Sequence, residues 1–437
     1  MDIEYLMEEI KEEMIKIRRD FHKHAESGWL EFYAAAKIIE YLKKVGLDIQ
    51  YGKKVLKHDA RMGLPTQKEF EEAFKRAEES GININLLKEL QDGYTGVVGT
   101  LETHRKGPVI AFRFDMDAVS GCETTSIQHR PFREGFSSYN PSAVHSCGHD
   151  GHMAMGLVLA KCLKKLSDEG KLTGKIKFIF QPAEEGARGA RAMVDAGVLD
   201  GVDYLLSGHI GFKATKIGEV ICATKGFLDT KKIDVVLKGK SAHAGAKPHE
   251  GNNALLAAAT IALGAHSFAQ HGDGIARVNV GVLKSGPSRN LIPDHALLQL
   301  EIRGESENIT NEIYKKVQSV IKGASLMYGV ACEMKIVGEA RSACSDYELS
   351  TLVERASKGI KKIDTIIPED VLGASEDVTF MINKVQEQGG KACYIMFGSS
   401  LAAGHHQSNF DFDEEVLPLG VGIYINTLRR MGVLDEN

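Results

Sequence analysis

The sequence predicts an α/β fold with a central, mostly parallel β-sheet covered by helices and a small α+β domain inserted into the chain. The first observation is that short, nearly continuous apolar runs at 108–114, 175–180 and 202–209 alternate with helix-like segments, which is typical of parallel strands buried on both faces. The second is a change near residue 226 to the order β-α-β-β-α-β, the ferredoxin-like arrangement. The third is the return of α/β patterning after residue 340, so one discontinuous domain encloses a smaller one.

The elements of the discontinuous domain follow from hydrophobic spacing. Apolar residues recurring at helical intervals predict amphipathic helices, and these segments are 4–19, 35–45, 152–168, 188–196, 346–359, 376–386 and the chain from about 414. A further apolar run at 391–398 predicts another strand. Residues 66–91 are charged and helix-like, and we interpret them as an insertion ahead of a glycine-rich segment at 94–100.

The inserted domain has its own order of elements. Alternation from 229 to 240 predicts its first strand. The remaining elements are a helix at 252–268, strands at 276–285 and 295–304, a long helix at 306–326 and a last strand at 330–338. The predicted boundaries are 1–225 and 341–437 for the larger domain and 226–340 for the inserted one.

Composition excludes several classes of protein. The 437 residues are 43% hydrophobic and 26% charged, close to the globular average, which excludes a disordered scaffold. The 54 basic and 59 acidic side chains give a formal net charge of −5, without the basic footprint of a nucleic-acid-binding protein. No apolar run approaches the ~20 residues of a membrane span, and the charged, amphipathic N-terminus lacks a signal-peptide core. Seven scattered cysteines without a CxxC pair suit reduced thiols. We therefore expect a cytoplasmic protein that binds neither nucleic acid nor membrane.

Residues that bind metals or move protons follow all three apolar runs. Asp115 and Asp117 follow the first run, Glu184 and Glu185 follow the second, and His209 ends the third. In open parallel sheets the ligand crevice lies at the carboxyl ends of the strands, so these side chains should meet at one edge. Each alone has an ordinary explanation, such as a turn for the aspartates or a helix-start charge pair for the glutamates. Their joint occurrence favours a functional site.

The segment HSCGHDGH at 145–152 lies between the first two runs. Cys147 and His149 flank a glycine that lets the backbone bend, so a thiolate and an imidazole can reach one ion from a tight loop. Because neighbours on an extended chain point in opposite directions, one of Glu184 and Glu185 can hold the ion while the other acts as general base. Mixed sulfur, nitrogen and oxygen ligands fit Zn²⁺ and are compatible with Mn²⁺ or Co²⁺, and their number supports two ions.

Five motifs occur in the order of a known family. At FRFDMDA (112–118), HSCGHDGHMA (145–154), FQPAEEGARGARAMV (180–194), GKSAHAGAKP (239–248) and HHQSNFDFDEE (405–415) the sequence resembles the M20 metallopeptidase/amidohydrolase family, in its aminoacylase-like subfamily. The resemblance implies a Zn-peptidase-like catalytic domain in 1–225 and 341–437 and a lid and dimerisation domain in 226–340. The insertion and the segments 18–29, 61–65 and 129–136 resemble the branch that cleaves p-aminobenzoyl-glutamate.

The resemblance implies the roles of the clustered residues. Cys147, His149, Glu185 and His209 would bind two divalent cations, Zn or Mn with Co compatible, the thiolate bridging them, and Glu184 would be the general base. The last ligand is a histidine in a segment that departs from the family, because it is one residue longer and lacks the usual proline. Counting back from FDFDE selects His406, whereas counting forward from Gly404 selects His405. We prefer His406.

The resemblance also implies roles for four other residues. His243, in the inserted domain, would stabilise the oxyanion across a dimer interface. Asn290 and Arg303 would contact the carboxylate end of the substrate, for which the planar guanidinium fork is suited. Asp117 would orient a ligand imidazole. From the residues alone, Asp117 could equally be a turn residue and Arg303 a solvated strand-end charge.

The expected activity is hydrolysis of the amide of an N-acyl amino acid. The resemblance favours p-aminobenzoyl-glutamate, giving p-aminobenzoate and glutamate, as in folate breakdown. The alternatives are a general N-acyl-amino-acid hydrolase, of the hippurate or indole-acetyl-amino-acid kind, and a non-catalytic subunit of a hetero-oligomeric hydrolase. We expect a homodimer formed through the inserted domain or a heteromer with a related B subunit.

Overall fold

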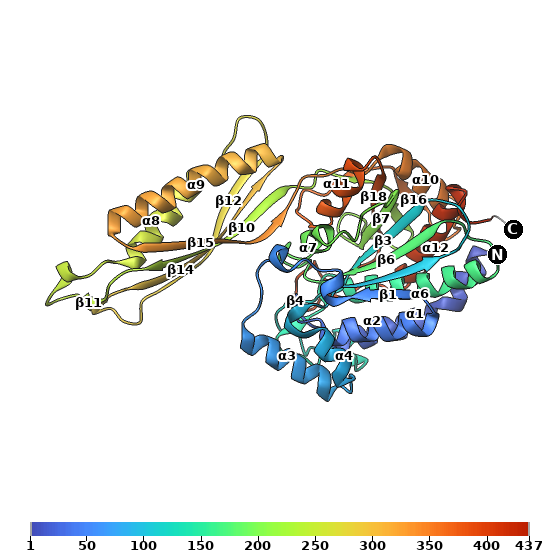
Figure 1. Cartoon of the computed structure of the whole chain (residues 1–437), viewed down its shortest axis with the longest axis horizontal. Helices are drawn as coiled ribbons and strands as arrows, with labels where there is room; N and C mark the ends of the chain where they lie inside the picture. The colour runs from blue at the N-terminus through green and yellow to red at the C-terminus, as the bar shows by residue number, and fades with distance from the viewer. Residues whose placement is uncertain (1, 436–437) are drawn as a thin grey trace. The chain divides into compact units, whose positions relative to one another are not determined.

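The computed structural model describes residues 2–435 and separates into two compact units (Figure 1). The larger unit contains the chain up to Lys225, Ala343–Leu372 and the chain from Asp377, and the smaller unit contains Gly226–Ser342 and Gly373–Glu376. The sequence analysis assigned this last segment to the larger domain. It joins the smaller unit because the carbonyl of Ala374 accepts a hydrogen bond from the N–H of Leu228 (2.9 Å).

The larger unit contains an eight-stranded sheet in the order β1-β2-β6-β3-β7-β18-β8-β16. The strands are β1 (Asp48–Tyr51), β2 (Val97–Glu102), β3 (Val109–Asp115), β6 (Lys175–Gln181), β7 (Tyr204–Ile210), β8 (Glu219–Ile221), β16 (Thr365–Ile367) and β18 (Lys391–Phe397). The four central strands β6, β3, β7 and β18 are parallel, as predicted. β1 and β2 add antiparallel pairs at one edge, and β8 pairs antiparallel with β18, which the sequence analysis did not predict. Short two-residue strands complete this unit: β4 (Val119–Ser120), β5 (Ala143–Val144), β9 (Thr224–Lys225) and β17 (Asp370–Val371).

Helices cover both faces of this sheet. They are α1 (Ile3–Lys23), α2 (Phe32–Val45), α3 (Gln67–Glu79), α4 (Ile84–Glu89), α5 (Arg130–Arg133), α6 (His149–Asp168), α7 (Ala190–Asp195), α10 (Tyr347–Ser357), α11 (Thr379–Glu387) and α12 (Val416–Arg430). Phe112 and Phe114 of β3 pack against Tyr424 of α12. Arg113 points to the opposite face, where it lies 3.4 Å from Asp377 just before α11.

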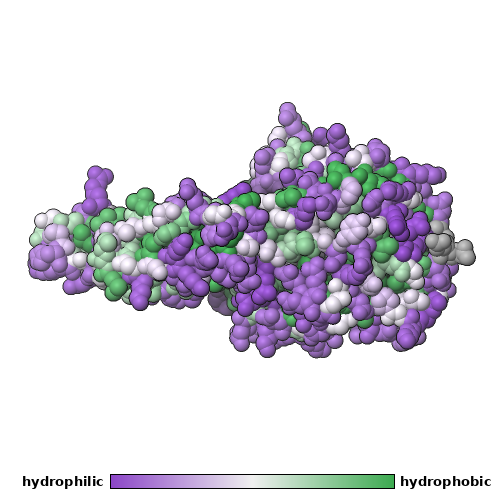
Figure 2. All heavy atoms as spheres, turned by 90° about the horizontal axis from the view of Figure 1, so that it is seen from above, coloured by the Kyte–Doolittle hydropathy of each residue, from purple (hydrophilic) through white to green (hydrophobic). Residues whose placement is uncertain are grey.

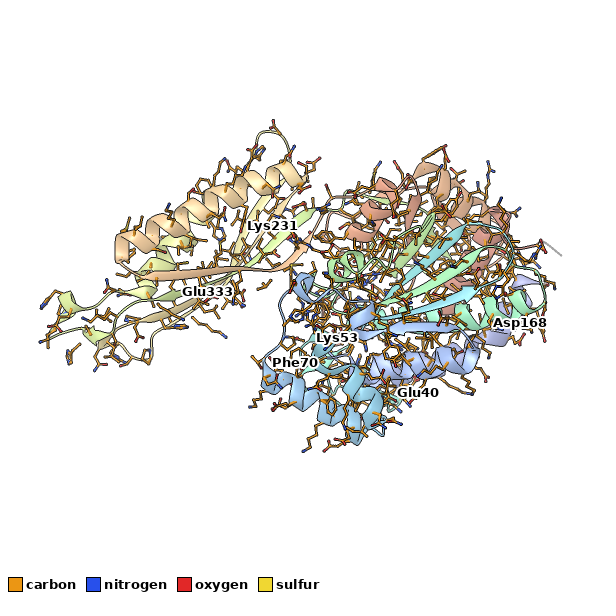
Figure 3. All side chains as sticks on the ribbon, in the orientation of Figure 1. Glu40, Lys53, Phe70, Asp168, Lys231 and Glu333 are labelled. Carbon is orange, nitrogen blue, oxygen red and sulfur yellow. The ribbon has the colours of Figure 1, made fainter. Side chains whose placement is uncertain are left out.

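Two predicted helices differ from the structure in instructive ways. The insertion at 66–91 is not one helix: it divides into α3 and α4 around Gly81, which adopts a left-handed φ of +84°. α3 packs its Phe70 ring against Gly93, and Figure 3 labels this side chain. Helix α6 begins at His149, three residues earlier than predicted, because Gly148 at φ +99° turns the chain directly into the helix.

The smaller unit is a four-stranded antiparallel sheet with two helices. Its elements are β10 (Asp229–Lys238), β11 (Ala242–His243), α8 (Ala254–His266), β12 (Ala276–Ser285), β13 (Leu291–Ile292), β14 (His295–Gly304), α9 (Glu307–Tyr328) and β15 (Ala331–Ala340). The sheet order is β12-β14-β10-β15, and β11 pairs separately with β13. Alternate residues of β10 and β14, such as Val235 and Leu298, form one core with Ile261 of α8 and Val317 of α9. Both helices therefore cover the same face of this sheet.

The surface agrees with the composition. Figure 2 shows hydrophilic residues over most of the visible face, with hydrophobic residues in smaller groups between them. Among residues 2–435, no helix combines the length and apolar character needed to cross a membrane.

Candidate metal centre

The carboxyl ends of the parallel strands bring the predicted ligands together. Cys147, His149 and His209 form one group whose ligand atoms all lie within 4.8 Å of one another. Cys147, Glu185 and His406 form a second group that meets the same limit. The Cys147 Sγ belongs to both groups, and it lies 3.4 Å from the Nε2 of His209. All five ligands named by the sequence analysis thus meet at one edge of the sheet, around a common sulfur atom.

Backbone carbonyls fix the orientation of two histidine rings. The Nδ1 of His149 donates to the carbonyl of Asp117 at 2.7 Å, and the Nδ1 of His209 donates to the carbonyl of Ile210 at 2.8 Å. Because Nδ1 carries the proton in each ring, Nε2 presents its lone pair. The Nε2 of His149 is buried and makes no hydrogen bond with any residue in the described part of the chain. Both rings are therefore held as ligands for a cation on the side of Cys147.

The Asp117 carboxylate has a different partner from the predicted one. Its two oxygens accept the backbone N–H groups of Glu184 and Glu185, each at 2.9 Å. The ring of His149 is instead held by the main-chain carbonyl of Asp117, and the nearer carboxylate oxygen lies 3.7 Å from Nδ1. Asp117 therefore links the His149 ligand to the loop that carries the two glutamates.

Glu184 and Glu185 lie in a turn, which corrects the reasoning based on an extended chain. Ala183, Gly186 and Ala187 all have positive φ, so the two side chains are not forced in opposite directions. Their carboxylates lie in one group with His149. Glu184 Oε2 is 3.9 Å from the His149 Nε2, whereas Glu185 Oε1 is 3.3 Å from the His406 Nε2.

The two adjacent histidines near the C-terminus have different environments. His406 has a left-handed φ of +66°, its N–H donates to the carbonyl of Ser146 at 2.8 Å, and its ring lies beside Glu185. His405 stacks on Phe212 with ring centroids 4.3 Å apart, and its Nε2 donates to the carbonyl of Ile210 at 3.1 Å. The geometry supports His406 as the candidate ligand.

The third histidine of the HSCGHDGH segment, His152, has a supporting role. Its Nδ1 donates to Asp115 at 2.6 Å, and its Nε2 accepts the N–H of Ile210 at 3.0 Å. Asp115 also accepts a hydrogen bond from Arg113 at 2.8 Å. With both ring nitrogens engaged, His152 ties the ends of β3 and β7 together rather than offering a free lone pair.

The electrostatics of the cluster fit divalent cations. Burial raises the pKa of the Cys147 thiol well above its usual range, and the charge of Glu185 adds to this shift. Burial lowers the pKa of His209, and neighbouring His152 and His405 lower it further, so this imidazole is neutral. A coordinating thiol is deprotonated by the cation it binds. Sulfur, imidazole and carboxylate donors, together with the orphaned Nε2 of His149, fit a site for borderline divalent cations.

The candidates in the smaller unit form two separate groups. His243 on β11 accepts the N–H groups of Gly245 and Ala246 at its Nδ1 (3.2 and 3.1 Å), so its exposed ring carries the proton on Nε2. The N–H of Ala244 donates to the carbonyl of Asn290 at 3.0 Å, which makes His243 and Asn290 neighbours.

Arg303 lies near the other end of β14, where its guanidinium binds both oxygens of Glu301 at 3.1 Å. From His295 to Arg303 the strand extends for about 27 Å at ~3.4 Å per residue. The structure therefore does not bring His243 and Arg303 together within one chain.

The sequence analysis missed two residues that hold the glutamate loop. Arg188 donates to the carbonyl of Glu185 and to the carbonyl of Gly63, each at 2.9 Å. Glu31, which is completely buried, accepts the N–H of Ala183 at 2.8 Å. For Arg188 the signal was its place three residues after Glu185, within hydrogen-bond reach in a tight turn. Glu31 has no comparable signal, because its partner lies 152 residues away.

Comparison with known proteins agrees with this fold and site. Residues 111–430 match peptidase family M20/M25/M40. The chain therefore belongs to this family, and it is an amidohydrolase of the metal-dependent kind, which confirms the resemblance found in the sequence.

Two relatives are similar over nearly the whole chain. It is 47% identical to the indole-3-acetyl-aspartic acid hydrolase of Enterobacter agglomerans, over 94% of this chain and 93% of the relative. It is 45% identical to one of the subunits of the p-aminobenzoyl-glutamate hydrolase of Escherichia coli, over 92% of each chain. The solved aminobenzoyl-glutamate utilization protein from Klebsiella pneumoniae has a TM-score of 0.83 at 40% identity, over 98% of both chains.

Proposed function

We propose that this protein hydrolyses the amide bond of p-aminobenzoyl-glutamate, releasing p-aminobenzoate and glutamate in folate breakdown. The observation that carries the proposal is the pair of donor groups sharing the Cys147 Sγ, with Glu184 beside them. Similarity to the Escherichia coli p-aminobenzoyl-glutamate hydrolase and to the Klebsiella pneumoniae structure supports this substrate. Hydrolysis of indole-3-acetyl-aspartate is the second candidate, supported by the 47% identical relative. Both substrates join an aromatic acyl group to an acidic amino acid.

The proposed site holds two divalent cations, Zn²⁺ or Mn²⁺ with Co²⁺ compatible. Cys147, His149 and His209 would hold one, and Cys147, Glu185 and His406 the other. When bound, such cations polarise a carbonyl group and lower the pKa of the attacking water. The protein's own contribution is to orient these ligands, chiefly through the carbonyls of Asp117 and Ile210.

Glu184 is the proposed general base. Its carboxylate takes a proton from the attacking water and then delivers it to the leaving amine of glutamate. The exposed Nε2–H of His243 donates a hydrogen bond to the oxyanion that develops on the scissile carbonyl. Asn290 beside His243, and Arg303, bind the carboxylates of the amino acid.

The smaller unit is the proposed lid and dimerisation domain. Support comes from the separation of His243 and Arg303 along β14, which is too long for one small substrate to touch both residues of the same chain. We therefore infer a homodimer in which His243 of one copy serves the site of the other. A heteromer with a related B subunit is the alternative, since the Escherichia coli relative is named as one of several subunits of its hydrolase. The seven free cysteines support a reducing, cytoplasmic location.

The test combines elemental analysis with turnover measured on one protein preparation. The expected result is two divalent cations per chain and a higher kcat/KM for p-aminobenzoyl-glutamate than for indole-3-acetyl-aspartate or hippurate. A preference for indole-3-acetyl-aspartate would select the second candidate. Metal-free protein without turnover, activated only by a metal-containing partner, would refute the proposal in favour of a non-catalytic subunit.

A further inference from the structure

The loop at 182–190 determines where the proposed general base lies. It connects β6 to α7 and carries both Glu184 and Glu185. Ala183 and Ala187 have φ values of +52° and +60°, a conformation that residues with a side chain rarely adopt. Such a backbone persists only where surrounding groups hold it.

Three buried carboxylates from distant segments hold this loop by its N–H groups. Asp117 accepts those of Glu184 and Glu185, and Asp377 accepts those of Gly189 and Ala190, all at 2.9 Å. Glu31, at the start of α2, accepts the remaining contact to the N–H of Ala183 at 2.8 Å. The three consecutive N–H groups of 183–185 are thus bound by two carboxylates from different parts of the chain.

The Glu31 side chain is itself fixed in one orientation. It is 0% exposed, and the oxygen that does not bind Ala183 accepts the hydroxyl of Thr95 at 2.7 Å. A carboxylate with both oxygens engaged cannot rotate without breaking one of these bonds. Glu31 therefore presents a fixed acceptor to the peptide unit that immediately precedes Glu184.

We propose that Glu31 is a positioning residue that sets the direction of the Glu184 carboxylate by holding the N–H of Ala183. This inference rests on the proposed hydrolysis, in which Glu184 is the general base. Without this acceptor, the peptide between Pro182 and Ala183 is free to rotate towards another partner. The Glu184 carboxylate then shifts relative to His149, although Asp117 still holds the following N–H groups.

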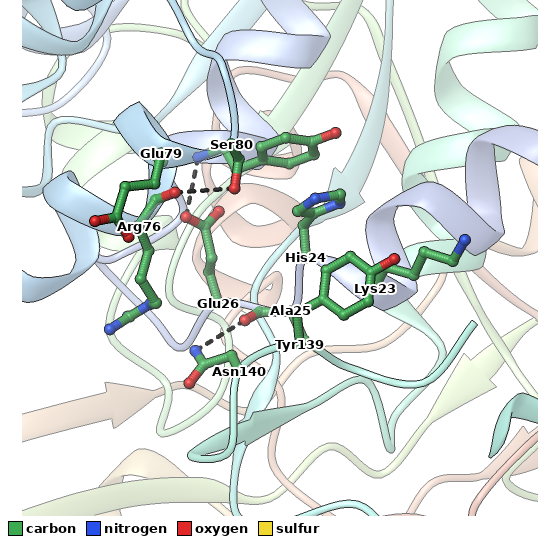
Figure 4. Close-up of a pocket in the computed structure, with 11 residues that line it drawn as sticks. Lys23, His24, Ala25, Glu26, Arg76, Glu79, Ser80, Tyr139 and Asn140 are labelled. Carbon is green, nitrogen blue, oxygen red and sulfur yellow. Dashed lines mark hydrogen bonds between the residues drawn. The ribbon is translucent and has the colours of Figure 1, made fainter. Parts of the chain in front are cut away.

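The chain offers a matched control in Glu26. Its carboxylate is also buried and accepts two N–H groups, those of Tyr33 and Ala34 at 3.0 Å, but both belong to the first turn of α2. Figure 4 shows Glu26 in a pocket lined by Arg76, Ser80 and Asn140. Glu26 accepts no bond from the loop at 182–190, so its loss should affect stability without displacing Glu184.

The experiment compares Glu31→Ala, Glu31→Gln and Glu26→Ala by kcat, KM, metal content and thermal stability. A 1 Å misplacement of a catalytic group can cost about 100-fold in rate, so we expect Glu31→Ala to lower kcat by about that factor with KM and metal content unchanged. Glu31→Gln should restore most of the turnover, because the amide oxygen accepts the N–H of Ala183 while the amide NH₂ donates to Thr95. Glu26→Ala should lower the melting temperature and retain kcat.

The inference is wrong if Glu31→Ala keeps the wild-type kcat, or if Glu31→Gln is as slow as Glu31→Ala. Should Glu31→Ala fail to fold, Thr95→Val provides the same test, since it releases the Glu31 carboxylate and should lower kcat at unchanged KM. Wild-type protein without turnover of p-aminobenzoyl-glutamate would refute the proposed function itself. Normal wild-type turnover with unaffected variants would refute only the role of Glu31.

Discussion

Replacing Asp117 by Asn should damage both the stability and the activity of the protein. The carboxylate accepts two N–H groups at 2.9 Å, one on each oxygen. Asn has one acceptor oxygen, and its NH₂ would face the N–H of Glu184 or Glu185. Each hydrogen bond to a charged acceptor contributes about 1.5–3 kcal/mol, and the abandoned N–H adds a desolvation cost, so we expect a loss of about 3 kcal/mol in the free energy of unfolding.

The functional effect of Asp117→Asn should follow from the same geometry. Displacing Glu184 should lower kcat by about 100-fold, and displacing Glu185 should weaken cation affinity by about 10–100-fold. Denaturant unfolding, steady-state kinetics and metal titration measure the three quantities.

Asp203→Asn is the control for Asp117→Asn. The carboxylate of Asp203 accepts a single N–H, from Val109 at the opposite end of β3, which Asn can still accept. Asp203→Asn should therefore leave kcat and metal affinity unchanged. Normal kcat and metal affinity in Asp117→Asn would refute the reasoning that this carboxylate holds both glutamates.

Three further outcomes are expected. His406→Ala should lower the metal content towards one cation per chain, whereas His405→Ala should keep two; equal losses by elemental analysis would contradict the assignment of the ligand. Glu184→Gln should keep its cations and lose about 10²–10⁴ in kcat, and mixing it with His243→Ala should restore about a quarter of the wild-type activity if two copies exchange in a symmetric dimer; no recovery after the copies have exchanged would exclude the contribution in trans. Burial raises the pKa of Glu26 from 4.5 to about 8, so its contribution favours folding below pH 4.5 and is lost as the pH rises through 8. Glu26→Gln should therefore gain stability relative to wild type over this range, and parallel pH–stability curves for the two proteins would contradict the shift.

The fold was predictable where the chain repeats a strong pattern. The runs that became β3, β6 and β7 are buried on both faces, so each shows a continuous apolar stretch. β8 and β16 have three residues each, which is too short for any periodicity to identify. The break at Gly81 depends on a left-handed backbone conformation that helical spacing alone does not show.

The site was predictable in its ligands and less so in its supports. Cys147 and His149 are close in sequence, and the strand ends located Glu185 and His209. The separate use of the carbonyl and the carboxylate of Asp117 depends on a loop conformation that no spacing predicts. The choice between adjacent histidines likewise needed the backbone, because one ring is held by stacking on Phe212.

The supports of the glutamate loop also create an electrostatic cost that the proposed cations would offset. Glu31 and Asp117 hold adjacent N–H groups, and the pKa of Glu31 rises to about 7 because of its burial and the nearby charge of Asp117. Glu184 and Glu185 add two more carboxylates within the same small region. Positive charge at the ligand cluster stabilises all four carboxylates, most strongly those that lie nearest. Cation binding and the order of the loop are therefore coupled: the acids that fix the proposed base are themselves stabilised by the cations that the base would serve.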